Sequence, residues 1–122
     1  MKPVVLVIED NEQNMYLMRF LLEKNGFTVL EATDGISGLE IAKKEKPKLI
    51  LLDIQLPRMD GYTVARELRK NSDLNNTLIV AVTSYAMAGD RELSIASGAD
   101  GYIEKPIDPE TFIEQITKYL NE

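Results

Sequence analysis

The sequence predicts an α/β fold in which five strands alternate with five helices, a (βα)5 pattern built on a doubly wound parallel sheet with helices on both faces. Short β-branched runs alternate with helical patterns along the whole chain. Two runs, LILL at 49–52 and LIVAV at 78–82, are apolar at successive positions. Because strands covered on both faces show such runs, these two are expected in the middle of the sheet.

The individual elements follow in order. Strands are expected at residues 3–8, 28–30, 49–52 and 78–82, with a weaker fifth at 101–103. Gly26 and Gly98 occupy positions typical of helix C-terminal glycines. Asp108, Pro109 and Glu110 are typical of an N-cap, a first helical residue and an acidic first turn. The last helix is therefore expected over residues 109–120.

Length and charge limit the class of protein. With 122 residues, 44% of them hydrophobic, the chain suits a single domain over residues 1–122 with no attached output domain. Its 20 acidic and 14 basic residues give a net charge of −6, which argues against nucleic-acid binding. The sequence contains neither a membrane-span pattern nor a signal-peptide pattern, so we expect a cytoplasmic protein without a membrane partner.

Two residue types are absent from the sequence. It contains no Cys and no His, which excludes thiol catalysis, disulfides, imidazole bases and most transition-metal sites. Carboxylate, hydroxyl and amine chemistry remains. A hard cation such as Mg²⁺, for which Mn²⁺ can substitute, is the metal that suits such a set of ligands.

Polar residues follow four of the predicted strands. In a doubly wound sheet, ligands bind outside the carboxyl ends of the strands, so these residues should share one rim. They are Glu9, Asp10, Asp53, Thr83, Ser84 and Lys105. Taken singly, each has an ordinary explanation as a helix N-cap, a turn residue or a surface lysine. Because residues of this kind follow four separate strands on one edge, a shared functional site is the favoured explanation.

The chemistry of this rim follows from its charges. Two carboxylates about 4 Å apart repel by about 4 kcal/mol at an effective dielectric constant near 20, a cost that folding alone would not select. Mg²⁺ bound to Asp10, Asp53 and the backbone carbonyl of Gln55 would remove that cost. Lys105 could then neutralise a phosphoryl oxygen while Thr83 hydrogen-bonds another. The rim is thus predicted to be a phosphoryl-transfer site.

Four segments closely resemble response-regulator receiver domains of the CheY-like fold: the acidic pair Glu9–Asp10, LLDIQLPRMDG around Asp53, AVTSYA and GADGYIEKPID. The segments EDNEQN and AMAGDRE resemble, more narrowly, DivK-type single-domain cell-division regulators and the receivers of hybrid histidine kinases. The resemblance implies strand order 2-1-3-4-5.

The resemblance also implies a role for each residue that matches the family motifs. Asp53 would be the phosphoacceptor, and Thr83 with Tyr102 would form the switch. Tyr85 would lie where the family tunes loss of the phosphoryl group, and Lys105–Pro106 would be a cis peptide. The metal would be held by Glu9, Asp10, Asp53 and Gln55, and the phosphate by Thr83, Ser84, Lys105 and Ile54.

The first helix carries a broad apolar arc. It is made up of Met15, Leu17, Met18, Leu21 and Leu22, with Tyr16 and Phe20 beside it. Such an arc can be ordinary core. In the family this helix docks the phosphohistidine partner, so a partner surface is expected at Asn11, Asn14, Met15 and Met18, where flexible methionines suit docking.

Partners follow from the same resemblance. Because the chain has no histidine, the donor should be a histidine kinase or a histidine phosphotransfer protein, or else a small acyl phosphate. The output should be a change at the face formed by the fourth helix, fifth strand and fifth helix, recognised by a downstream protein effector. A monomer or weak dimer is expected.

Three other classes of function compete with this interpretation. A haloacid-dehalogenase-type phosphatase needs an acid two residues after its nucleophile, where Gln55 stands here. A flavodoxin-like module needs a glycine- and hydroxyl-rich phosphate loop, whereas EDNEQN is acidic. A receiver-shaped module that is never phosphorylated normally lacks the acidic pair, the acceptor or the lysine, all of which are present.

Overall fold

The computed structural model describes residues 3–84 and 90–121, without the side chains of residues 90 and 91. Within these residues five strands alternate with five helices, and a short 3-10 helix, η1, precedes the fourth strand. The elements are β1 (Val4–Ile8), α1 (Glu12–Lys24), β2 (Thr28–Ala32), α2 (Gly35–Glu45), β3 (Leu49–Asp53), α3 (Gly61–Arg69), η1 (Ser72–Leu74), β4 (Leu78–Thr83), α4 (Asp90–Ala96), β5 (Gly101–Glu104) and α5 (Phe112–Leu120).

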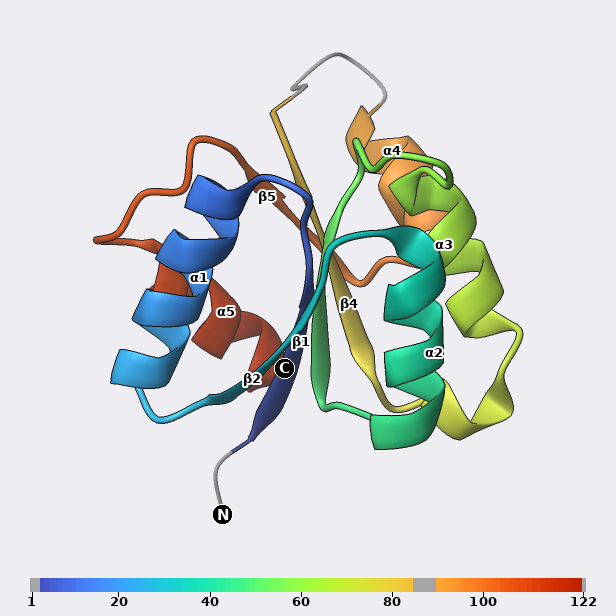
Figure 1. The fold of residues 1–122 in the computed structure, drawn as a ribbon, viewed down its shortest axis with the longest axis horizontal. Coiled ribbons are helices and arrows are strands. Elements are labelled where there is room, and N and C mark those ends of the chain that lie inside the picture. The colour runs from blue at the N-terminus through green and yellow to red at the C-terminus, as the bar shows by residue number, and fades with distance from the viewer. Residues whose placement is uncertain (1–2, 85–89, 122) are drawn as a thin grey trace.

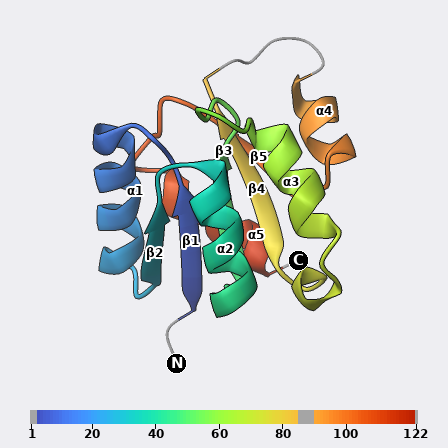
Figure 2. The ribbon, with the colours of Figure 1, turned by 45° about the vertical axis from the view of Figure 1, so that its right-hand side comes forward.

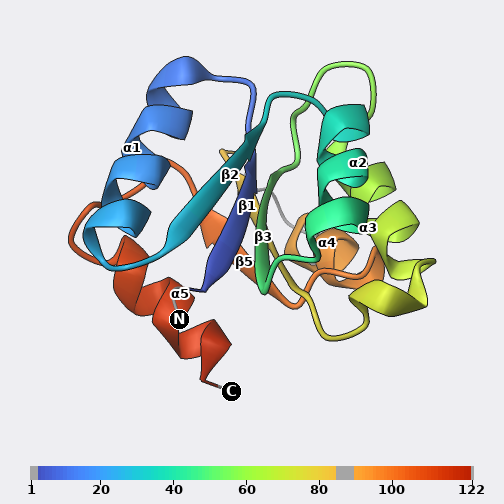
Figure 3. The same ribbon diagram turned by 60° about the horizontal axis from the view of Figure 1, so that its bottom comes forward.

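The strands form one parallel sheet in the order β2-β1-β3-β4-β5, as the resemblance implied. Helices α1 and α5 cover one face, and α2, α3 and α4 cover the other (Figures 1 and 3). A separate apolar cluster fills the space on each face, one around Met18, Leu22 and Phe112 and the other around Leu52, Val64 and Leu68. The predicted (βα)5 fold is confirmed.

Strand β3 lies at the centre of the sheet and all five of its residues are buried. Parallel register places Ile8 of β1 beside Leu52, and Asp53 beside Val82 of β4. The strand ends therefore meet at one edge of the sheet, the upper edge in Figure 2. The loops that carry the predicted site residues leave from this edge.

Most element boundaries agree with the sequence to within two residues. Gly26 and Gly98 follow α1 and α4 with φ angles of 90° and 116°, the conformation for which a helix-terminal glycine is suited. The start of the last helix was predicted wrongly. Asp108 accepts a hydrogen bond from the Glu110 amide, but this caps a turn, and α5 begins only at Phe112.

No described helix is long and apolar enough to cross a bilayer.

Arg69, the last residue of α3, joins three segments at the edge of the sheet opposite the site. Its guanidinium donates to the carbonyls of Gly98 and Leu74 at 2.9 Å each, and to Asp100 Oδ2 at 2.6 Å. The same Oδ2 atom accepts the Ile79 amide at 2.9 Å. This arginine therefore fixes α3 and the turn before β5 to the start of β4.

We predict that Arg69→Met lowers the free energy of unfolding by about 2 to 3 kcal/mol, since it leaves two carbonyls and a carboxylate without their charged donor. Arg19→Met is the matched control and should cost little stability, because Arg19 is exposed and its ion pairs are with the exposed carboxylates of Glu23 and Glu31. Urea unfolding measures both. Equal losses in the two variants would contradict the role given to Arg69.

Candidate functional site

The carboxyl ends of β1, β3, β4 and β5 surround one open hollow in the surface. The residues that line it come from all four strand ends and from the start of α1, and most of them are polar. They are Glu9, Asp10, Asn11, Asn14, Asp53, Gln55, Ser84, Lys105 and Pro106. The structure thus brings together segments that lie far apart in the sequence, as the strand pattern predicted.

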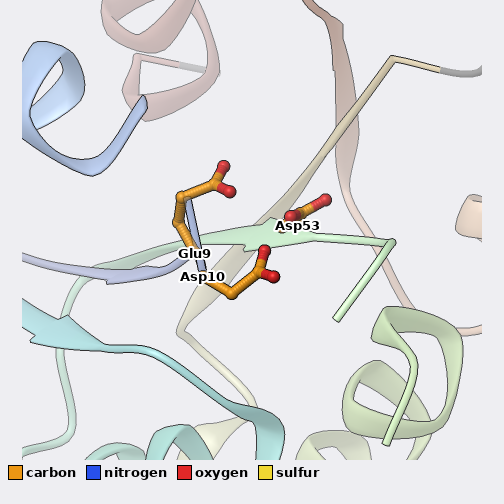
Figure 4. A group of neighbouring side chains, drawn as sticks. All are labelled: Glu9, Asp10 and Asp53. Atoms are coloured by element: carbon orange, nitrogen blue, oxygen red, sulfur yellow. The ribbon is translucent and has the colours of Figure 1, made fainter. Parts of the chain in front are cut away.

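Three carboxylates form the floor of this hollow. Glu9, Asp10 and Asp53 each offer an oxygen, and these oxygens lie within 4.8 Å of one another. Figure 4 shows the three side chains turned toward a common space. Glu9 and Asp53 are 1% and 3% exposed, whereas Asp10 is open to solvent. Like charges this close and this buried need a cation, and oxygen donors suit a hard divalent one.

Lys105 supplies one positive charge to the cluster. Its ammonium lies 2.8 Å from Glu9 Oε1 and 3.4 Å from Asp53 Oδ2, and its side chain is only 10% exposed. The lysine amide donates to the Thr83 carbonyl at 2.8 Å, which fixes it beside β4. The Lys105–Pro106 peptide bond is cis. A buried lysine between two buried acids is expected only where the charges compensate one another.

Compensation is incomplete at Glu9. Burial, together with the nearby Asp53 carboxylate, raises the pKa of this carboxyl to about 7, although the Lys105 ammonium acts in the opposite direction. Oε1 faces the ammonium without a well-directed hydrogen bond, while Oε2 accepts the Asn11 amide at 3.2 Å. The site therefore retains negative charge that a single lysine does not balance.

The loop after Asp53 holds the carboxylate in place. Asp53 Oδ1 accepts the Gln55 amide at 3.0 Å, and the Gln55 side chain accepts the Ser84 hydroxyl at 2.7 Å. Gly61 at the start of α3 packs directly behind this loop, since a Cβ there would lie 2.6 Å from the Asp53 carbonyl oxygen. Sequence reasoning overlooked Gly61, although the motif MDG that contains it was part of the resemblance.

Ile54, which is expected to take part in phosphate binding, uses its backbone for contacts within the fold. Its amide donates to the Val82 carbonyl at 3.2 Å, its carbonyl accepts the Gly61 amide, and its side chain is apolar and buried. Its role in phosphate binding stays a prediction. Its backbone is committed to joining β3, β4 and α3.

Thr83 and Tyr102, the two residues expected to form the switch, lie on neighbouring strands and differ in burial. Thr83 ends β4 and is 1% exposed, with Glu104 as its neighbour in β5. Tyr102, two residues earlier in β5, is half-buried and packs against the cluster beneath α2 and α3. Tyr85 lies outside the described residues.

The partner surface expected on α1 is only partly exposed. Met15 and Met18 are 7% and 1% exposed and belong to the core beneath α1, so they do not form a partner surface. Asn11 caps the helix by accepting the Asn14 amide at 2.9 Å. The large apolar side chains that α1 does expose are Tyr16 and Phe20, at 70% and 49%.

Comparison with known proteins identifies the family. The family model for the response regulator receiver domain matches residues 5–117 of the sequence. The polar-differentiation response regulator DivK of Brucella anthropi is 41% identical over 118 residues, covering 97% of this chain and 96% of that protein. The chain therefore belongs to the response-regulator receiver family. As a receiver of two-component signal transduction, it acts between a kinase or phosphotransfer donor and a downstream effector.

Two solved structures resemble the whole fold. The receiver domain of a sensor histidine kinase from Pseudomonas aeruginosa PAO1, solved with a magnesium ion in its active-site cleft, has a TM-score of 0.91 at 29% identity, with 100% of each chain covered. The BeF3-activated receiver domain of RstA from Klebsiella pneumoniae has a TM-score of 0.88 at 31% identity, with 98% of this chain and 99% of that chain covered.

The raised pKa of Glu9 predicts a pH dependence in metal-free protein. The unfolded carboxyl titrates near 4.5 and the folded one near 7, so the folded state binds the proton more tightly. The contribution of Glu9 to stability should therefore be greatest below pH 4.5 and be lost as the pH rises to about 7, by on the order of 3 kcal/mol.

Chemical unfolding in chelator across this pH range provides the measurement. Glu9→Gln should remove most of the loss of stability with rising pH, because the amide does not titrate. Glu40→Gln, which changes an exposed carboxyl of α2, is the control and should leave the wild-type profile in place. A Glu9→Gln profile that matches the wild type would show that Glu9 does not titrate as described.

Proposed function

We propose that Asp53 accepts a phosphoryl group from a phosphohistidine on a histidine kinase or histidine phosphotransfer protein, with Mg²⁺ as cofactor. The observation that carries this proposal is the Lys105 ammonium, which lies between two buried carboxylates beside a third. Asp53 is the acid that combines the end of the central strand, contact with Lys105 and access to the hollow.

The residues of the hollow fit Mg²⁺. Asp10 and Asp53 would supply carboxylate oxygens, the Gln55 backbone a carbonyl oxygen, and Glu9 a more distant carboxylate. Bound there, Mg²⁺ would neutralise the acidic cluster and withdraw charge from the phosphoryl group being transferred. The Pseudomonas aeruginosa receiver, which holds magnesium in its active-site cleft, supports this choice of metal.

The transfer uses few protein groups. An Asp53 carboxylate oxygen attacks phosphorus, the bond from phosphorus to the donor imidazole nitrogen breaks, and that nitrogen keeps the electron pair. The Lys105 ammonium, already 3.4 Å from Asp53 Oδ2, neutralises a phosphoryl oxygen, while the Thr83 and Ser84 hydroxyls donate to others. Gln55 stands where a phosphatase of the dehalogenase type needs an acid, and its amide cannot shuttle a proton.

We propose that Thr83 and Tyr102 transmit the phosphorylation signal from Asp53 to the surface. Phosphorylation adds roughly −1.5 to −2 charge units at Asp53, which draws the Thr83 hydroxyl inward and lets Tyr102 follow. The face formed by α4, β5 and α5 then changes. A coupling of about 1 to 3 kcal/mol would alter the affinity of an effector protein roughly 5- to 150-fold.

We predict that Asp53→Asn abolishes phosphorylation, because an amide oxygen is too weak a nucleophile to replace the carboxylate. The protein is incubated with acetyl phosphate and Mg²⁺, and the phosphoryl adduct is measured by intact mass. Asp60→Asn is the matched control: Asp60 is an exposed N-cap of α3, where asparagine caps equally well, so its adduct yield should equal the wild type's. An undiminished adduct in Asp53→Asn would sink the assignment.

A further inference from the structure

The hydroxyl of Tyr119, near the end of α5, contacts the backbone of β5. It accepts a hydrogen bond from the Tyr102 amide at 3.2 Å and donates one to the Tyr102 carbonyl at 3.3 Å. Strand β5 pairs only with β4 among the described residues, so it is an edge strand with one open side. One phenol hydroxyl thus satisfies both backbone groups of Tyr102 that would otherwise face that open side.

Gly101 makes this contact sterically possible. A Cβ at position 101 would lie 2.4 Å from both Cε1 and Cζ of the Tyr119 ring. The aromatic ring therefore lies directly over the glycine, and its hydroxyl reaches the next residue of the strand. Any side chain at position 101 would displace the ring and with it the two hydrogen bonds.

The contact links the two faces of the sheet. Tyr119 packs against the core beneath α1 and α5, whereas Tyr102 packs against the core beneath α2 and α3. The sheet separates these two cores, so a movement of the Tyr102 side chain reaches α5 through the β5 backbone. The Tyr119 hydroxyl makes its hydrogen bonds to that backbone at Tyr102 itself. Both tyrosines also line one surface hollow with Ile95, Gln115 and Lys118.

We propose that Tyr119 is a positioning residue that couples α5 to the β5 backbone at Tyr102, and that this coupling carries the activated state of the site to α5. The inference rests on the proposed function, since it takes Tyr102 to respond when Asp53 is phosphorylated. It adds a residue to the output that does not touch the phosphoryl group. Its effect is on the response of α5 and not on the chemistry at Asp53.

Tyr119→Phe tests the coupling, because it keeps the ring over Gly101 and removes only the hydroxyl. Backbone amide NMR spectra are recorded with Mg²⁺, before and after addition of beryllofluoride, which mimics the phosphoryl group. The variant should bind beryllofluoride like the wild type and show wild-type shifts around Asp53 and Thr83. The shifts of residues 112–120 should fall to less than half of those in the wild type.

Two comparisons separate coupling from a general loss of stability. Tyr16→Phe removes an exposed hydroxyl from α1 and should leave the whole response unchanged. Gly101→Ala should reproduce the Tyr119→Phe pattern by displacing the ring.

In the resting state, the Tyr102 amide of Tyr119→Phe should exchange its hydrogen about tenfold faster, the fold-change that corresponds to loss of one neutral hydrogen bond.

A full wild-type response of α5 in Tyr119→Phe would overturn the inference and leave the proposed function intact. A wild-type protein that binds beryllofluoride without any shift at Tyr102 or in α5 would overturn the proposed output, and the coupling with it. Unchanged exchange of the Tyr102 amide in Tyr119→Phe would count against the hydrogen bonds themselves.

Discussion

The chemistry proposed for this receiver depends on the ammonium of Lys105. It stands between two carboxylates that are almost completely buried, at 2.8 Å from Glu9 and 3.4 Å from Asp53, and a third acid lies beside them. Buried acids are tolerated only when a cation compensates them, and one lysine compensates only part of this charge. The remaining negative charge suits the hollow to a divalent cation and, with that cation bound, to the phosphoryl group of the proposed function.

The sheet makes this arrangement possible by bringing distant segments together. Because the central strands are parallel, their carboxyl ends meet at one edge. Both are apolar up to their last residue, so polar residues stand only at or beyond the strand ends. Glu9, Asp53, Thr83 and Lys105 all lie at such ends. At the opposite edge, Arg69 joins α3 to η1 and to the turn before β5 by three hydrogen bonds.

Much of this could be predicted from the sequence, because strand runs and the residues that follow them are local signals. Other features depend on tertiary packing. The capping pattern at Asp108 is satisfied by a turn, so α5 starts later than its motif suggests. Met15 and Met18 were expected on a surface, yet the width of the α1 core buries them. Ile54 and Tyr119 act through backbone hydrogen bonds, which leave no distinctive pattern in the sequence.

Mg²⁺ binding to Lys105→Met tests the central claim most directly, because methionine retains the apolar stem and removes the charge. Calorimetric titration should show Mg²⁺ bound about tenfold more tightly than by the wild type, since a nearby positive charge costs a cation about 1 to 4 kcal/mol. Beryllofluoride should bind far more weakly, because its anionic fluorines lose the ammonium. Circular dichroism confirms that the variant is folded. A folded Lys105→Met that binds Mg²⁺ no more tightly, and beryllofluoride as well as the wild type does, would contradict the account.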